Sequence, residues 1–175
     1  MPTTETAMTK IWLPPTSVHS EANTSMANEA VTRNGCQPGY KILFTTCIRL
    51  YSRRNSYWGA REACEMEGAT LAMPKTQELD LALRNLVHTE GNNLSFWFGL
   101  KDNNYFRLRK RQWKWEDGSA LGNYQGWIPG GPDNRRWTHR TRLCVHYWSG
   151  RTGYPMWNDR RCSCRHSFIC QTLLA

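Results

Sequence analysis

The sequence predicts an α+β fold, because strand-like and helix-like segments follow one another in blocks and not in strict alternation. A strand-like stretch comes first, two amphipathic segments follow, and the second half holds several short apolar strands separated by turn residues. Seven cysteines in 175 residues are the third observation. That number is typical of a disulfide-stapled domain in an oxidising, extracellular setting, and the length suits one domain with its own core.

The N-terminal part is expected to hold a lead-in and a hairpin. Residues 1–33 are rich in Thr, Ser, Ala and Asn without an apolar period, so we expect a disordered segment before one domain over residues 34–175. No signal peptide is visible at the start, and no apolar run approaches the roughly 18 residues of a membrane span. Residues 36–51 alternate between polar and apolar side chains, which favours a short hairpin.

Two helices are expected next. Asn55 or Ser56 can cap a helix that runs to about Glu67, and Gly68 is a natural residue to end it. Thr76 can cap a second helix. Its apolar residues recur at helical spacing, which we interpret as core packing, and they are Leu79, Ala82, Leu83, Leu86 and Val87.

The second half predicts strands around an irregular loop. Residues 96–100, 113–115, 144–148 and 168–170 are apolar or aromatic and bounded by turn residues, as in buried strands. The span 118–153 is otherwise dense in Gly, Pro, Asn and Arg. A loop of this length inside a compact domain is usually functional.

A pair of acceptor side chains, Asn158 and Asp159, lies directly after Trp157 and shortly before Cys162. Oxygen ligands of this kind suit a hard cation such as calcium. Because neighbouring residues of a strand point to opposite faces, both can reach one ion only where the chain bends or leaves the strand. A surface Asn-Asp turn beside a structural disulfide is the alternative interpretation.

Four motifs occur in a characteristic order within residues 36–171. They are Phe96-Trp97-Phe98-Gly99-Leu100, Trp113-x-Trp115-x-Asp117-Gly118-Ser119, Trp127-x-Pro129-Gly130-x-Pro132-Asp133-Asn134 and Trp157-Asn158-Asp159. Together with the cysteine pattern, the set resembles the C-type lectin-like domain. The resemblance implies two helices packed on antiparallel sheets, with a long irregular loop. It also implies the disulfides Cys36–Cys47, Cys64–Cys170 and Cys144–Cys162, with Cys164 as the odd thiol.

The resemblance further implies a carbohydrate site at a calcium ion, held by the loop and the strand after it. The implied sugar-binding residues are Pro132, Asp133, Trp137, Asn158 and Asp159, and the implied metal ligands are Asp133, Asn158 and Asp159. Pro132 is expected to be cis, and Asp133 resembles the galactose-type triplet. Two positions depart from the family pattern: Gly131 lacks a side chain, and Arg142 stands where the family often has Glu. Because a cation there repels calcium, replacing Arg142 with Glu is expected to strengthen calcium binding.

The charge of the chain offers another hypothesis. The net charge is +9, and between residues 101 and 165 the fourteen Lys and Arg residues outnumber the five Asp and Glu residues by nine. A basic face favours anionic partners, so calcium-independent binding of sulfated glycans, or of a protein ligand, is the alternative to a calcium lectin. A solvated basic face without a ligand is the simpler reading of the same residues. The candidates for an anionic ligand are Arg107, Arg109, Lys110, Arg111, Arg135 and Arg136.

Two other classes of function are disfavoured. Nucleic-acid binding would suit the charge, but the cysteines indicate an extracellular protein. The sequence also contains no nucleophile elbow, paired catalytic acids or metal-hydrolase helix, so we expect recognition and not catalysis.

Overall fold

The computed structural model describes residues 35–103, 111–133, 142–150 and 152–174, so the expected disorder of residues 1–33 lies outside the described part. The helices are α1 (Tyr57–Glu65) and α2 (Gln77–Glu90). The strands are β1 (Lys41–Leu43), β2 (Thr46–Asn55), β3 (Thr70–Leu71), β4 (Phe96–Asp102), β5 (Trp113–Trp115), β6 (Leu143–Trp148), β7 (Met156–Arg161) and β8 (His166–Leu173).

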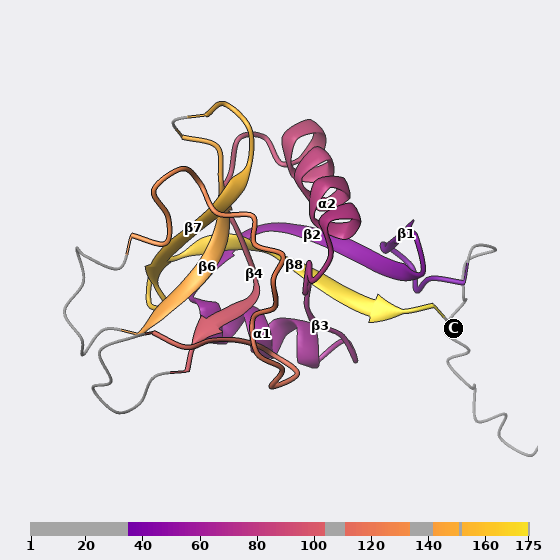
Figure 1. Ribbon diagram of the computed structural model, residues 1–175. Coiled ribbons are helices and arrows are strands. Elements are labelled where there is room, and N and C mark those ends of the chain that lie inside the picture. The colour runs from indigo at the N-terminus through magenta and orange to yellow at the C-terminus, as the bar shows by residue number, and fades with distance from the viewer. Residues whose placement is uncertain (1–34, 104–110, 134–141, 151, 175) are drawn as a thin grey trace, which may run out of the picture.

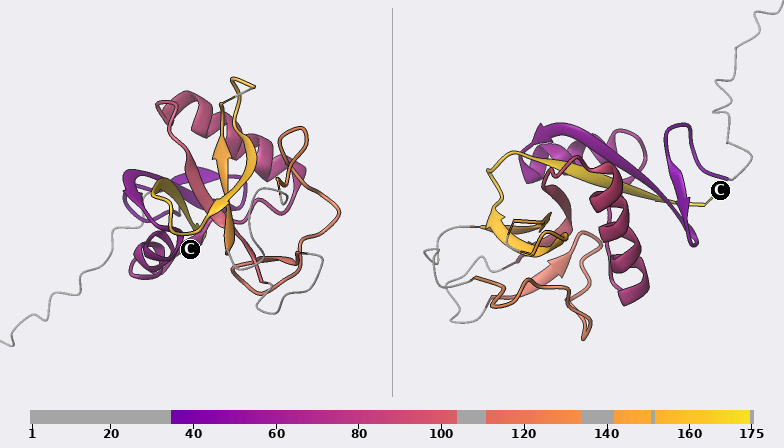
Figure 2. Two further views of the ribbon diagram at one scale, coloured as in Figure 1. Left: turned by 90° about the vertical axis from the view of Figure 1, so that its left-hand side faces the viewer. Right: turned by 90° about the horizontal axis from the view of Figure 1, so that it is seen from above.

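The strands form one sheet in the order β1-β2-β8-β4-β6-β7, with β3 paired to β8 and β5 paired to β4. The pairing is antiparallel except between β4 and β8, which run parallel. In Figure 1, α2 lies above the long β2–β8 pair and α1 lies below it, and the left-hand view of Figure 2 also shows α2 above and α1 below. The predicted α+β class is confirmed.

Both helices begin where the sequence predicts. The Ser56 hydroxyl accepts a hydrogen bond from the Gly59 amide (3.2 Å), and the Thr76 hydroxyl accepts one from the Leu79 amide (3.3 Å). Such caps satisfy amides that have no partner inside the helix. Helix α1 ends at Glu65, slightly earlier than expected, and the turn behind it passes through Gly68 at φ +70°.

The sheet separates two apolar clusters, because side chains alternate along each strand. On β6, Cys144 belongs to the cluster that α1 covers, together with Trp97, whereas Val145 belongs to the cluster of α2, together with Trp157. We call these two sides of the sheet the α1 face and the α2 face. The distinction decides which site residues can meet.

Three disulfides staple the domain, and their pairing confirms the expected one. Cys36 bonds Cys47, Cys64 bonds Cys170, and Cys144 bonds Cys162. Cys64–Cys170 closes a loop of 106 residues, and chain entropy makes such a bridge worth about 4–5 kcal/mol. Cys164 is the free thiol among the described cysteines, and it is half-buried. Within the described residues, no helix is long and apolar enough to cross a membrane.

Candidate functional site

The long loop, residues 116–142 between β5 and β6, returns to the sheet beside β7. The Ile128 amide donates to the Trp157 carbonyl (2.9 Å), and the Trp157 amide donates to the Gly126 carbonyl (3.0 Å). Trp127 and Trp157 also form an isolated bridge. These bonds fix the segment that leads into Pro132 and Asp133 against the strand that carries Asn158 and Asp159.

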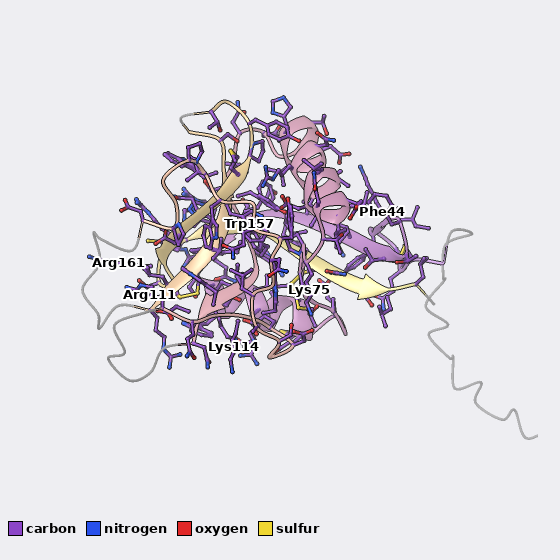
Figure 3. All side chains as sticks on the ribbon, viewed as in Figure 1. Phe44, Lys75, Arg111, Lys114, Trp157 and Arg161 are labelled. Atoms are coloured by element: carbon purple, nitrogen blue, oxygen red, sulfur yellow. A yellow bond between two sulfur atoms is a disulfide. The ribbon has the colours of Figure 1, made fainter. Side chains whose placement is uncertain are left out.

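A buried carboxylate on α2 holds this loop in place. Asp80 is fully buried and accepts hydrogen bonds from the Tyr124 hydroxyl, the Tyr147 hydroxyl and the Trp157 indole, each at 2.6 Å. The Arg84 guanidinium pairs with Asp80 at 2.7 Å and donates to the Gly126 carbonyl at 2.8 Å. Asp80 therefore ties α2, the loop, β6 and β7 together, and Trp157 lies at the centre of the molecule in Figure 3.

The loop places Asp133 next to Asp159. The Gly131–Pro132 peptide is cis, as expected, and the Asp133 amide donates to Asp159 Oδ1 at 2.6 Å. Asp159 is 3% exposed, and its Oδ2 atom is buried without a hydrogen-bond partner. Burial raises the pKa of Asp159, the nearby Asp133 carboxylate raises it further, and the Asp133 amide and the Arg111 charge oppose this rise.

Strand β7 continues without a break through the acceptor pair, so the two side chains diverge. Asn158 lies opposite His146 and Asp159 lies opposite Val145, and residues paired across a ladder share a face. Asn158 accordingly reaches the α1 face, where its Nδ2 donates to His146 Nε2 at 3.2 Å. Asp159 points to the α2 face, so the structure brings Asp133 and Asp159 together and leaves Asn158 on the other side.

A pair of stacked histidines lies beside Asn158: His146, which contacts it, is buried, and His166 is half-buried. His146 and His166 stack with ring centroids 4.5 Å apart, and both pack on Trp97. Burial is the main reason that the pKa of His146 lies well below its usual value and that of His166 falls to about 4. Both rings are therefore neutral at physiological pH, which lets His146 Nε2 accept the amide of Asn158.

Arg142 also lies away from the carboxylates. It precedes Cys144 by two positions, and its carbonyl continues the ladder by accepting from the Cys162 amide, so it shares the α1 face with Cys144. Its guanidinium carbon lies 5.5 Å from the centroid of the Trp58 ring. The repulsion that the sequence led us to expect between Arg142 and a calcium ion at Asp159 therefore does not arise in this arrangement.

These positions do not fit a calcium ion held by the expected ligand set. Calcium takes about six to eight oxygens, whereas the α2 face offers the carboxylates of Asp133 and Asp159, Asn158 points away, and Gly131 has no side chain. Within the described ranges, no group of three or more His, Cys, Asp or Glu residues could hold a metal. The orphaned Oδ2 of Asp159 still marks a place where a positive or hydrogen-donating group is favourable.

Most candidates for an anionic ligand lie outside the described residues: Arg107, Arg109, Lys110, Arg135, Arg136 and the stacking candidate Trp137. Arg111 is described, and its guanidinium forms an ion pair with Asp102 at the end of β4. Both side chains are largely buried, at 12% and 4% exposure. Arg111 is therefore an internal cation and not part of an open basic surface.

A basic cluster that the sequence analysis missed lies on the α1 face. Lys101 Nζ, like Arg142, lies 5.5 Å from the centroid of the half-buried Trp58 ring. Glu116 accepts from Lys101 Nζ at 2.7 Å and pairs with Arg61 at 3.4 Å. We call Trp58, Arg61, Lys101, Glu116 and Arg142 the Trp58 cluster. Its members come from segments that are far apart in sequence, so no local motif predicts it.

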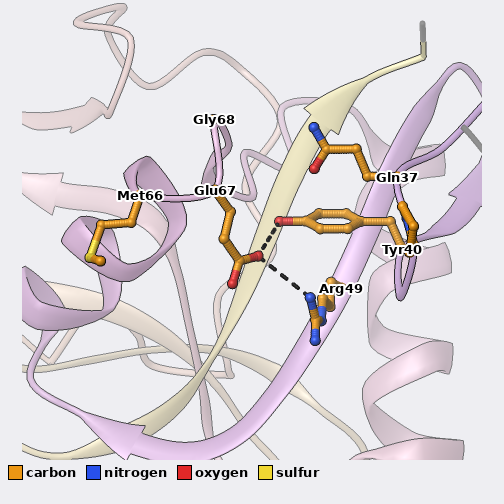
Figure 4. A pocket seen from close by; sticks show the side chains of 7 residues that line it. Gln37, Tyr40, Arg49, Met66, Glu67 and Gly68 are labelled. Atoms are coloured by element: carbon orange, nitrogen blue, oxygen red, sulfur yellow. Dashed lines mark hydrogen bonds and ion pairs between the residues drawn. The ribbon is translucent and has the colours of Figure 1, made fainter. Parts of the chain in front are cut away.

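A separate pocket of about 650 Å³ opens between the N-terminal hairpin and the end of α1. Glu67 lies in it and accepts from the Tyr40 hydroxyl at 3.1 Å, while Arg49 approaches the same carboxylate at 3.6 Å (Figure 4). The Arg49 guanidinium also lies over the Tyr51 ring at 4.6 Å. These polar groups bond to one another, so they join the N-terminal hairpin to the end of α1.

Comparison with known proteins places this geometry in a family. Residues 53–172 match the family model of the lectin C-type domain. The chain belongs to the C-type lectin family. It is 43% identical over 142 residues to a C-type lectin of Cerberus rynchops, covering 79% of this chain and 84% of that one. The match to C-type lectin lectoxin-Enh5 of Pseudoferania polylepis, at 44% identity over 75 residues, covers less than half of that relative, 42%.

Solved structures agree with the family. The mouse scavenger receptor C-type lectin carbohydrate-recognition domain superposes with a TM-score of 0.66 at 27% identity, covering 81% of this chain and all of that one. A Ca2+-independent C-type lectin of Saxidomus purpuratus, SPL-2, superposes with a TM-score of 0.67 at 23% identity over 81% of this chain and 96% of that chain. At that identity, the second likeness concerns the fold alone.

Proposed function

We propose that this C-type lectin domain binds glycans at the point where the long loop meets β7, by recognition and without catalysis. The observation that carries the proposal is the hydrogen bond from the Asp133 amide to the buried carboxylate of Asp159. It fixes the loop residue that resembles the sugar-contacting position of the family, while the Asp133 side chain stays half-exposed. The three disulfides support an extracellular place of action.

A half-exposed carboxylate can accept hydrogen bonds from two neighbouring hydroxyls of a hexose, because each of its oxygens has free lone pairs. The preference for galactose-type sugars rests on the Pro132-Asp133 resemblance. Trp127, half-buried and 5.1 Å from the Trp113 ring, is an aromatic neighbour in the same loop. Asp133 thus supplies the polar contact of the proposed site.

A glycan array in calcium buffer and in chelator tests the proposal, with wild type, Asp133→Ala and the control Asp117→Ala. Asp117 is an exposed carboxylate in the turn after β5. We expect galactose-terminated glycans to bind in both buffers, and Asp133→Ala to weaken binding by about 10- to 100-fold, the value of one or two hydrogen bonds to a charged group. Unchanged binding by Asp133→Ala, or an array without galactosides, contradicts the proposal.

A second candidate is binding of sulfated glycans on the Trp58 cluster, favoured by two cations over one aromatic ring. The cluster carries three cations and one carboxylate, and arginine forks suit sulfate oxygens. The same array includes sulfated glycans. If this surface binds them, Arg142→Gln lowers their signal, while Arg165→Gln, which removes another exposed arginine outside the cluster, does not. Equal loss in both variants indicates attraction by net charge alone.

A further inference from the structure

The pocket between the N-terminal hairpin and the end of α1 contains a guanidinium that is fixed in place by stacking. The guanidinium carbon of Arg49, on β2, lies 4.6 Å from the centroid of the Tyr51 ring and 5.9 Å from that of the Tyr40 ring. A Cβ added to Gly39, in the turn before β1, would lie 3.1 Å from the same carbon. Within the described residues, its one ion pair is with Glu67, at 3.6 Å, which is too long for a hydrogen bond. The N–H donors of Arg49 are therefore fixed in direction and open to a ligand.

Glu67 is held by hydroxyl groups and not by Arg49. The Tyr40 hydroxyl donates to its Oε2 at 3.1 Å, and the Tyr51 hydroxyl donates to the same carboxylate. Burial and the hydrogen bond to Glu67 raise the pKa of Tyr51 to about 12, so this hydroxyl keeps its proton at physiological pH. In Figure 4, the side chains of Tyr40 and Arg49 both approach the Glu67 carboxylate. A ligand that takes the donors of Arg49 thus leaves the tyrosine bonds between the hairpin and the end of α1 intact.

The charges around Tyr51 leave one positive charge in excess. The guanidinium carbon of Arg53, on the same strand, lies 4.9 Å from the centroid of the Tyr51 ring and 5.4 Å from that of the Phe168 ring. No carboxylate of the described residues pairs with Arg53. Arg49, Arg53 and Glu67 together therefore carry a net charge of one. A ligand with a single negative charge neutralises it, whereas a dense polyanion is also repelled by Glu67.

The pocket has room and polar groups for more than an ion. Its volume of about 650 Å³ falls within the range of about 300–1,000 Å³ that is usual for small-molecule sites. The side chains of Gln37 and Glu67 also line it, and both are half-buried. An amide and a carboxylate can bind the hydroxyls of a sugar, and a guanidinium binds an oxyanion in forked geometry.

We propose that this pocket is a second glycan-binding site, which takes a sugar with a single carboxylate or sulfate group and binds that group through Arg49. The proposal goes beyond the site at Asp133, because the described residues that line the pocket all lie between Gln37 and Gly68. A peptide with a free carboxyl terminus is the competing ligand. The acceptors on Gln37 and Glu67 favour the sugar, because its hydroxyls can use them.

An NMR titration of the amide resonances of the full oxidised chain, in chelator, tests the proposal. The probes are the methyl glycosides of N-acetylneuraminic acid, glucuronic acid and glucose, a sulfated methyl glucoside, and an acetylated dipeptide with a free carboxylate. None contains galactose, so they avoid the preferred sugar of the first site. The variants are Arg49→Gln and Asp133→Ala, and the control Arg165→Gln removes an exposed arginine that does not line the pocket.

At least one acidic sugar is expected to shift the amides of Gly39 and Gly68 in wild type, Asp133→Ala and Arg165→Gln, and the carboxylate and sulfate probes show which group the site prefers. Neutral methyl glucoside is expected to shift neither amide. Arg49→Gln is expected to weaken binding about 10- to 100-fold, the value of one or two hydrogen bonds to a charged group.

Three results would overturn the proposal: acidic sugars that leave both amides unshifted, equal affinity in wild type and Arg49→Gln, or tighter binding of the dipeptide at the same amides. If Arg49→Gln does not fold, the wild-type shifts still decide, because they show whether the sugar binds in the pocket. Loss of galactoside binding on the array would leave the result in Asp133→Ala untouched, so the two proposals fail separately.

Discussion

Replacing Asp80 with Asn removes the charge at the centre of the network that holds the long loop. Asp80 is fully buried and accepts from two tyrosine hydroxyls, one indole and the Arg84 guanidinium. The Arg84 side chain is 8% exposed, so the substitution leaves a buried cation without its counter-ion. Breaking such a pair costs about 3–5 kcal/mol, a large part of the roughly 5–15 kcal/mol that stabilises a typical domain.

Urea unfolding of the oxidised protein, followed by fluorescence of its nine tryptophans, measures this loss. The control Asp117→Asn removes an exposed carboxylate paired with Lys75 and is expected to cost less than about 1 kcal/mol. Removing both charges, with Asp80→Asn and Arg84→Met together, should cost less than the sum of the single changes. A loss below about 1 kcal/mol for Asp80→Asn would refute the reasoning.

Three further changes probe the same arrangement. Gly126→Ala puts a Cβ 2.1 Å from a guanidinium nitrogen of the buried ion pair and should cost about 1–3 kcal/mol in urea unfolding, whereas Gly122→Ala, with open space around it, should cost little. Arg142→Glu should leave the calorimetric calcium response at the wild-type level, because its side chain lies on the opposite face of the sheet from the carboxylates; a strengthened response would restore the expectation from sequence. Because the folded pKa of His166, about 4, lies below its ordinary 6.5, the unfolded chain gains the proton first, so stability falls as the pH drops from about 6.5 to 4. His166→Gln should reduce this fall in the pH profile of unfolding and leave the part that buried His146 contributes; an unchanged profile would count against this reasoning.

Local pattern predicted most of the fold. Ser56 and Thr76 cap the helices because a side-chain oxygen before an apolar period is a local signal. The paired disulfides and the cis bond before Pro132 followed from the family resemblance and are present.

The site was less predictable, because its contacts join distant parts of the chain. Asp80 looks like an ordinary polar residue of an amphipathic helix, yet its partners Tyr124 and Trp157 lie 44 and 77 residues further on. The alternation of side chains along a strand predicted that those of Asn158 and Asp159 would point to opposite faces unless the chain bent there. Only the register of β7 with β6 decides that it does not bend.

The most direct test of the account is a crystal structure of the protein with a bound galactoside, grown with calcium chloride in the solution. We predict the sugar on the Asp133 carboxylate, the Asp133 amide still bonded to Asp159, Asn158 beside His146 on the other face of β7, and no metal ion between the sugar and Asp159. A calcium ion that bridges the sugar to Asp159 and Asn158 would contradict this prediction.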